Sequence, residues 1–177
     1  MTTLVEKVVA LSDALTAAGI RHAFGGALAL AYYTEDPRGT RDIDVNAFVP
    51  ADRNEPVLTA LPAGVRVPTG TTERLAKDCQ VRLWWDDTPV DLFLDYAPLH
   101  AQAARAIRRV PFAGRKISIL GPVELVLFKA LFDRPQDWVD IATAVEAGSV
   151  DTGVVRRRLR GLVGADDARL AKWDALA

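Results

Sequence analysis

The sequence is nearly devoid of the residues that build disulfides and zinc sites. Its 177 residues include one cysteine, Cys79, and two histidines, His22 and His100. A lone cysteine can form neither an internal disulfide nor a multi-cysteine metal site, and two histidines offer few soft ligands. The composition therefore argues against zinc chemistry, whereas binding of hard cations by carboxylates stays open.

Long hydrophobic runs are also lacking. The longest, such as residues 123–128, fall far short of the roughly 20 residues that span a bilayer. The N-terminus has no basic segment followed by an apolar one, which is the pattern of a signal peptide. We therefore expect a cytoplasmic protein with no membrane partner.

Charge is unevenly distributed along the chain. Residues 1–99 hold 9 Lys and Arg against 14 Asp and Glu, whereas residues 100–177 hold 13 against 9. The two parts therefore carry −5 and +4, which agree with the overall −1. A basic half can attract a polyanion, although a solvated basic face is the commoner explanation of so small an asymmetry.

The first half of the chain mixes helix and strand patterns. Apolar residues recur at helical spacing from Leu4 to Leu15, and Gly19 closes this helix in the usual C-terminal position. The segments that follow are predicted to be strand 21–24, a turn at Gly25–Gly26, helix 27–33, strand 42–49, helix 51–61 and a loop or short strand over 62–70.

Two hairpins and a helical tail complete the predicted order. Strands 80–85 and 90–94 flank a turn at 86–89, and strands 107–112 and 116–120 flank a turn at 113–115. Helices are then predicted over 122–132, 135–147, 152–163 and 166–175. We therefore expect an α+β fold, with a mixed sheet flanked by helices in residues 1–120 and a C-terminal helical bundle in residues 121–177 packed on it.

Two aspartates, Asp42 and Asp44, stand in the otherwise apolar strand 42–49. Side chains two apart in a strand point to the same face, so this pair projects together while Ile43 points into the core. At roughly 6 to 7 Å and an effective dielectric of about 20, two such charges repel by about 2 to 3 kcal/mol. A compensating cation is therefore expected, and Mg²⁺ is the simplest choice because it binds a few carboxylates together with phosphates and water.

A third carboxylate, Asp91, is the one charge in strand 90–94. If that strand lies beside strand 42–49, three carboxylates could hold two metal ions, which suits in-line transfer of a phosphoryl group. The pair Gly25–Gly26 supports this interpretation, because two glycines before a helix let backbone N–H groups approach a phosphate. Each feature alone has a plain explanation, a solvent-facing strand or a tight turn, but the combination is far more specific.

These residues resemble the signature of the DNA polymerase β-like nucleotidyltransferase superfamily. That signature is a Gly-Gly or Gly-Ser pair opening a helix, Asp-hydrophobic-Asp on the next strand and a later strand aspartate, matched here by Gly25–Gly26, Asp42–Ile43–Asp44 and Asp91. Residues 38–44, with Lys129 and residues 136–141, look similar to the AbiEii-type subgroup of toxins. Gly26 stands where many relatives carry serine, which removes a hydroxyl contact.

The resemblance implies a nucleotidyltransferase fold and Mg²⁺-dependent transfer of a nucleoside monophosphate from an NTP, such as ATP, to an acceptor hydroxyl. It implies a two-metal site at Asp42, Asp44 and Asp91, with Asp91 also the candidate base. It further implies nucleotide contacts from Gly25, Gly26, Thr40, Arg41, Lys129 and Asp137, of which Lys129 is also counted as catalytic. A surface lysine explains Lys129 equally well, and loop arginines such as Arg38 and Arg41 are usually solvated.

Two basic clusters are candidates for contacting the acceptor. They are Arg105, Arg108, Arg109, Arg115 and Lys116 around the second hairpin, and Arg156, Arg157, Arg158 and Arg160 on helix 152–163. Such clusters bind RNA backbones, which favours an RNA (tRNA) end as acceptor, as in toxin relatives with a cognate antitoxin. An outward-facing helix surface is the simpler explanation of the second cluster. Trp84, Trp85 and Trp138 are candidates to stack a base, although aromatics more often belong to a core.

Two other functions stay open. One is nucleotidyl transfer to a small hydroxylated molecule such as an antibiotic. The other is a non-catalytic regulatory protein that kept the fold, against which the intact set Asp42, Asp44 and Asp91 argues, since a retired site has no reason to keep repelling charges.

Overall fold

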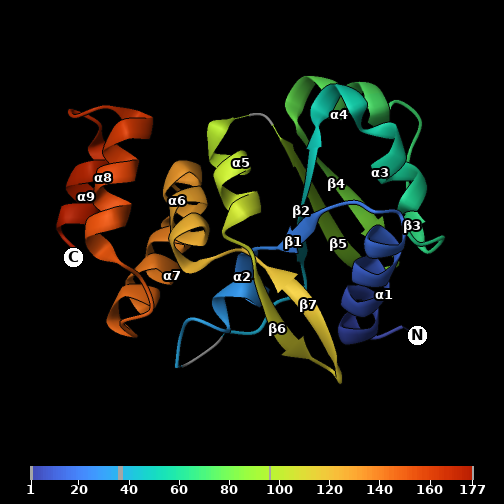
Figure 1. Ribbon diagram of the computed structural model, residues 1–177, viewed down its shortest axis with the longest axis horizontal. Helices are drawn as coiled ribbons and strands as arrows, with labels where there is room; N and C mark the ends of the chain where they lie inside the picture. Colours follow the sequence, from blue (N-terminus) through green and yellow to red (C-terminus); the bar gives the residue numbers. More distant parts are fainter. Residues whose placement is uncertain (1, 36–37, 96, 177) are drawn as a thin grey trace. The chain divides into compact units, whose positions relative to one another are not determined.

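The computed structural model describes residues 2–35, 38–95 and 97–176, which form two compact units (Figure 1). The first unit contains Met1–Leu28 and Gly39–Leu120, and the second contains Ala29–Arg38 and Gly121–Ala177. The segment 29–38 therefore belongs with the C-terminal helices, although it precedes most of the sheet in the sequence.

The first unit is built on a seven-stranded mixed sheet. Its strands are β1 (His22–Phe24), β2 (Ile43–Pro50), β3 (Val65–Arg66), β4 (Gln80–Trp85), β5 (Thr88–Asp95), β6 (Arg108–Phe112) and β7 (Arg115–Ile119). They lie in the order β3-β4-β5-β2-β1-β7-β6. The pairs β2–β5 and β1–β7 are parallel, and the other neighbouring pairs are antiparallel.

The two faces of this sheet differ in character. In β4, Val81, Leu83 and Trp85 are buried and the alternate residues are exposed. Helix α1 (Leu4–Ala17) covers the buried face, because its Lys7 lies over the Trp85 ring, 6.0 Å from the centroid. Arg82 therefore points to the face away from α1. Helix α5 (Pro98–Arg105) packs against β2 and β5.

Lys7 also fixes the turn between β4 and β5. Trp85 pairs with Thr88, so the turn has only Asp86 and Asp87, and Asp86 adopts a positive φ of 54°. The buried Lys7 ammonium donates to the Trp85 carbonyl at 2.8 Å and the Thr88 hydroxyl at 3.0 Å, and it lies 3.3 Å from the Asp86 carboxylate. Lys7 of α1 therefore stabilises the two-residue turn, and this turn sets the register between β4 and β5.

Short helices complete the first unit. They are the 3₁₀ helix η1 (Ala51–Arg53), α3 (Glu55–Ala60), α4 (Thr71–Asp78) and the first residues of α2 (Gly26–Leu30). The second unit contains the end of α2 and the helices α6 (Pro122–Phe132), α7 (Pro135–Glu146), α8 (Thr152–Val163) and α9 (Ala168–Asp174). Its core includes the fully buried Leu127, Ile141, Leu159 and Trp173. None of the helices in the described ranges has both the length and the apolar character that crossing a membrane requires.

The α+β class, with a mixed sheet and C-terminal helices, is confirmed, and β4, α6 and α8 have their predicted bounds. The predicted helix 27–33 is wrong in length, because Tyr32 and Tyr33 donate to carbonyls three residues back and α2 ends at Leu30. The prediction of one continuous helix over 51–61 is wrong, because Asn54 separates the 3₁₀ helix η1 from α3. The sequence patterns also missed α4 and α5.

Candidate active site

The candidate site is a row of residues across four neighbouring strands of the sheet. Asp44 of β2 lies directly beside Asp91 of β5, and Asp91 lies opposite Arg82 of β4. On the other side, the Gly25 amide after β1 donates to the Asp44 carbonyl at 2.9 Å. Strand 90–94 thus lies beside strand 42–49, which was the condition for a site of three carboxylates, and the row runs from Gly25 through Asp44 and Asp91 to Arg82.

Asp42 is the residue just before β2, and its carboxylate lies at this site, 3.6 Å from the Arg82 guanidinium. Its backbone N–H donates to the Thr40 hydroxyl at 3.1 Å, and that hydroxyl lies 3.2 Å from the Asp42 carbonyl. Thr40 therefore shapes the backbone that presents Asp42. Arg41, between them, is exposed. The proposed nucleotide contacts of Thr40 and Arg41 stay predictions.

Gly26 makes a close approach to the carboxylate of Asp44. Its φ is +53°, a conformation that L side chains rarely adopt, and a Cβ at this position would overlap Asp44 Oδ2. A Cβ on Gly25 would lie 3.2 Å from both Asn46 Nδ2 and Leu120 Cδ1. Gly26 is thus needed for packing against the Asp44 carboxylate, whereas Gly25 is packed against Asn46 and Leu120. The Gly25 N–H already donates to the Asp44 carbonyl. The proposed nucleotide contacts of Gly25 and Gly26 stay predictions.

Arg82 is the residue of the row that the sequence patterns missed. Its guanidinium binds both carboxylate oxygens of Asp91, at 2.8 and 2.7 Å, and lies 3.6 Å from Asp42 Oδ2. The hydrogen bond to Asp91 is the largest cause that raises the pKa of Arg82. Counting back from a two-residue turn would have placed Arg82 opposite Asp91, but the predicted turn was four residues long.

The donor set suits a hard divalent cation. Three carboxylates, Asp42, Asp44 and Asp91, lie on one face of the sheet, and Asp42 and Asp91 have side-chain exposures of 43% and 18%. Within the described ranges, no three His, Cys, Asp or Glu side chains are gathered tightly enough to hold a metal. Both oxygens of Asp91 instead bind Arg82. The residues therefore fit Mg²⁺ in their chemistry, provided that Arg82 releases Asp91.

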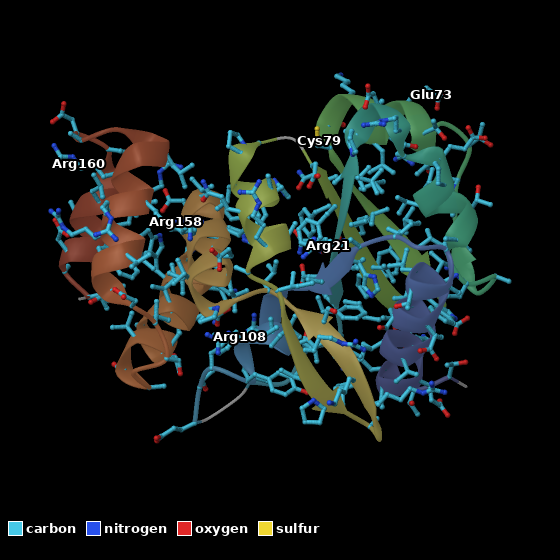
Figure 2. All side chains as sticks on the ribbon, in the orientation of Figure 1. Arg21, Glu73, Cys79, Arg108, Arg158 and Arg160 are labelled. Atoms are coloured by element: carbon cyan, nitrogen blue, oxygen red, sulfur yellow. The ribbon has the colours of Figure 1, made fainter. Side chains whose placement is uncertain are left out.

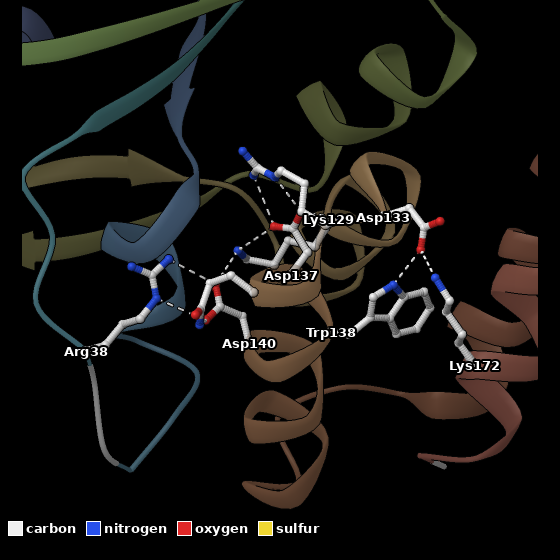
Figure 3. Close-up of polar contacts among 9 residues, drawn as sticks. Arg38, Lys129, Asp133, Asp137, Trp138, Asp140 and Lys172 are labelled. Carbon is white, nitrogen blue, oxygen red and sulfur yellow. Dashed lines mark hydrogen bonds and ion pairs between the residues drawn. The ribbon is translucent and has the colours of Figure 1, made fainter.

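Lys129 lies in a buried cluster of charges in the second unit (Figure 3). Its ammonium is 2.6 Å from Asp140 Oδ2 and 3.5 Å from Asp137 Oδ1, and the side chain is only 6% exposed. The interpretation of Lys129 as a surface lysine is therefore wrong. Contacts of Lys129 and Asp137 with a nucleotide stay predictions.

Arg38, Gln136 and Arg134 complete this cluster. Arg38 binds both oxygens of Asp140 at 3.0 and 3.1 Å, Gln136 donates to Asp140 at 2.9 Å, and Arg134 binds Asp137. Burial works to raise the pKa of Asp140, but the hydrogen bonds from Arg38, Lys129 and Gln136 outweigh it and lower that pKa. Arg38 is thus an ion-pair partner in this cluster.

The basic residues divide into paired and solvated ones. On α8, Arg156 binds Asp174 and Arg158 binds Glu124, which leaves fewer cations for a polyanion. Arg115 lies 3.5 Å from Asp13. Arg105, Arg108, Arg109 and Lys116 are exposed, and Figure 2 labels Arg108 at the start of β6. The β6–β7 hairpin is therefore the more open of the two basic clusters.

The tryptophans offer one exposed ring for stacking. Trp84 is 42% exposed, whereas Trp85 is buried under Lys7. The Trp138 indole donates to Asp133 at 2.6 Å, and Lys172 lies over its ring. Trp85 and Trp138 are thus engaged within their own units.

Solved structures share this fold at low sequence identity. The solution structure of the antibiotic-resistance factor ANT(2'')-Ia has a TM-score of 0.63 and 17% identity, covering 99% of this chain and 96% of that one. The crystal structure of ANT(2'')-Ia in complex with adenylyl-2''-tobramycin has a TM-score of 0.67 and 17% identity, covering 91% and 99%. An antigenic nucleotidyltransferase-like protein from Paracoccidioides brasiliensis has a TM-score of 0.50 and 18% identity, covering 97% and 92%. No family model and no curated protein matches the sequence. The fold is therefore nucleotidyltransferase-like.

Proposed function

We propose that the protein transfers a nucleoside monophosphate from an NTP to an acceptor hydroxyl in a Mg²⁺-dependent reaction. The observation that carries the proposal is the register of β2 and β5, which places Asp44 beside Asp91 on the face away from α1. The nucleotidyltransferase-like fold supports the same reaction class.

The three aspartates of the site and Gly26 of the glycine pair each have a part in this reaction. Asp42, Asp44 and Asp91 would hold Mg²⁺, which supplies charge neutralisation at the phosphates and makes the acceptor hydroxyl easier to deprotonate. A carboxylate oxygen of Asp91 would accept the hydroxyl proton. The hydroxyl oxygen then bonds to the α-phosphorus, the bond to the bridging oxygen breaks, and pyrophosphate leaves. Gly26 lets the chain approach the Asp44 carboxylate closely, which would help to place that metal ligand beside the phosphates.

The acceptor that the comparisons favour is a small hydroxylated molecule. The chain and ANT(2'')-Ia match over nearly the full length of both, and one of those structures contains a nucleotide-modified small molecule, adenylyl-2''-tobramycin. A hydroxylated, cationic compound of that chemical class is therefore our first candidate for the acceptor of this chain.

An RNA end is the second candidate. The exposed cations of the β6–β7 hairpin, Arg108, Arg109 and Lys116, support it because they can contact a phosphate backbone. The pairing of Arg156 and Arg158 with acidic side chains weakens the contribution of α8. A role as an AbiEii-type toxin with a cognate antitoxin stays a prediction that the comparisons do not favour.

The experiment is transfer of label from each of the four α-labelled NTPs with Mg²⁺. One arm contains total cell RNA, and the other contains hydroxylated small molecules, with tobramycin among them. We expect a small-molecule product whose mass rises by one nucleoside monophosphate, and label in RNA would favour the second candidate instead. Asp44→Asn should abolish transfer, whereas Asp52→Asn, an exposed carboxylate on η1, should not. Full activity of Asp44→Asn would refute the metal-site assignment.

A further inference from the structure

Arg82 occupies the carboxylate oxygens that a metal ion in this site would need. Its two hydrogen bonds to Asp91 engage both oxygens of that carboxylate, and the same guanidinium lies 3.6 Å from Asp42. Such a fork is among the stronger charge-assisted contacts in proteins. A divalent cation and Arg82 therefore compete for Asp91.

We propose that Arg82 is a gating residue of the carboxylate row, an inference that rests on the function proposed above. It pairs with Asp91 and lies close to Asp42 while the site is free of nucleotide, and it must release Asp91 before a metal binds there. One guanidinium carries a single positive charge against the three carboxylates of the row, so it offsets only part of their repulsion.

The exposure of Arg82 allows this release. Its side chain is 51% exposed, so its guanidinium can move into water without itself becoming a buried, unpaired charge. Asp91 is only 18% exposed, so the metal ion would have to compensate the charge that Arg82 leaves behind. Lys7 and Lys129 differ in this respect, because both are buried among their partners. The strand fixes the Cα of Arg82 opposite Asp91, so the released group stays near the row.

A nucleotide would favour the release. Its phosphates bring negative charge to the row and offer the guanidinium a new partner of the kind that arginine binds in a fork. The exchange of Asp91 for phosphate makes binding of the metal and of the nucleotide mutually dependent. Metal alone should then bind weakly, and metal with nucleotide should bind well.

The test measures Mn²⁺ binding, which is detected as a loss of the electron paramagnetic resonance signal of free Mn²⁺. Without nucleotide, Arg82→Gln should bind Mn²⁺ at least about tenfold more tightly than wild type, because Asp91 is released from its fork. Arg82→Lys, which keeps one charge but no fork, should lie between the two. With a non-hydrolysable NTP analogue, the difference between Arg82→Gln and wild type should fall to less than about threefold.

Arg115→Gln is the matched control, because Arg115 is also an exposed arginine of this sheet that pairs with an aspartate, Asp13. It should bind Mn²⁺ as wild type does. Suppose that, with the analogue, wild type binds Mn²⁺ more tightly than Asp44→Asn does. If Arg82→Gln then binds Mn²⁺ no more tightly than wild type without nucleotide, Arg82 forms only a surface ion pair and the gating inference is refuted. If Asp44→Asn and wild type bind Mn²⁺ equally with the analogue, the metal site itself, and with it the proposed function, is refuted.

Discussion

Gly26 shows how a missing side chain shapes the site at the scale of one residue. A serine at this place, as in the signature that the sequence resembles, would add a hydroxyl, but here the Asp44 carboxylate fills the space a Cβ would take. The positive φ of Gly26 adds a second requirement for glycine. A serine at position 26 is thus incompatible with this position of the Asp44 carboxylate.

Gly26→Ala should therefore destabilise the fold and displace Asp44. We expect the free energy of unfolding to fall by about 1 to 3 kcal/mol, measured by urea denaturation, and nucleotidyl transfer to fall with it. Gly161→Ala is the control, because Gly161 lies within α8 and a Cβ there meets nothing within 4 Å among the described atoms. It should stabilise by about 0.5 to 1 kcal/mol. Equal effects of the two substitutions would contradict the close approach at Gly26.

His100, on α5, makes stability depend on pH. Burial lowers its pKa to about 4, below the value of about 6.5 for an exposed histidine. Between these values the unfolded chain binds a proton that the folded chain does not, so stability is full above pH 6.5 and falls as pH falls toward 4. Burial lowers the pKa of His22 as well, which acts in the same direction.

The free energy of unfolding should fall by about 1 kcal/mol for His100 alone between about pH 7.5 and about pH 5.5. Burial raises the pKa of Asp95, and its titration has the opposite effect on stability, so the comparison with a His100 variant is needed. His100→Gln should remove that part of the slope in urea unfolding experiments repeated at each pH. An unchanged slope in the variant would mean that His100 takes up its proton equally well in the folded chain.

At the scale of elements, the sequence predicted those helices and strands whose bounds are determined by residues close together in the chain. β4 alternates buried and exposed residues, and α6 begins with a proline in its first turn, so both could be located from the sequence. Helices α4 and α5 bury few apolar side chains, Leu75 in one and Leu99 and Ala103 in the other, so they leave almost no periodic signal. The role of Arg82 was missed because its pairing with Asp91 depends on the register between β4 and β5.

That register depends on α1 through Lys7. Lys7→Met should remove the donor of the Trp85 carbonyl and the Thr88 hydroxyl and lower the free energy of unfolding by about 2 to 3 kcal/mol. Lys116→Met, a lysine exposed on β7, should change it by less than about 0.5 kcal/mol. Chemical denaturation of both variants gives the comparison. Similar stabilities would show that Lys7 contributes no more than a surface charge.

At the scale of the whole molecule, the chain's two units are not two successive halves of the sequence. Residues 29–38 leave the first unit and join the C-terminal helices, where Arg38 binds Asp140 in the cluster that also holds Lys129. No local pattern predicts this, because the carboxylate that binds Arg38 is 102 residues away in the sequence. Arg38, two residues before Thr40 in the sequence, thus has its ion-pair partner in the second unit.

Asp140→Asn tests this division of the chain by hydrogen exchange and mass spectrometry. The variant removes the negative charge that pairs with Arg38 and with the buried Lys129. Backbone amides in residues 29–35 and in α6 and α7 should therefore exchange faster. Strands β2, β4 and β5 should keep their protection, because their contacts lie in the first unit. Asp133→Asn is the control, since Asp133 pairs with Lys172 at the surface and its loss should leave residues 29–35 unchanged. If the sheet lost protection together with residues 29–35, the chain would unfold as a single cooperative unit, and the segment would not belong to the second unit alone.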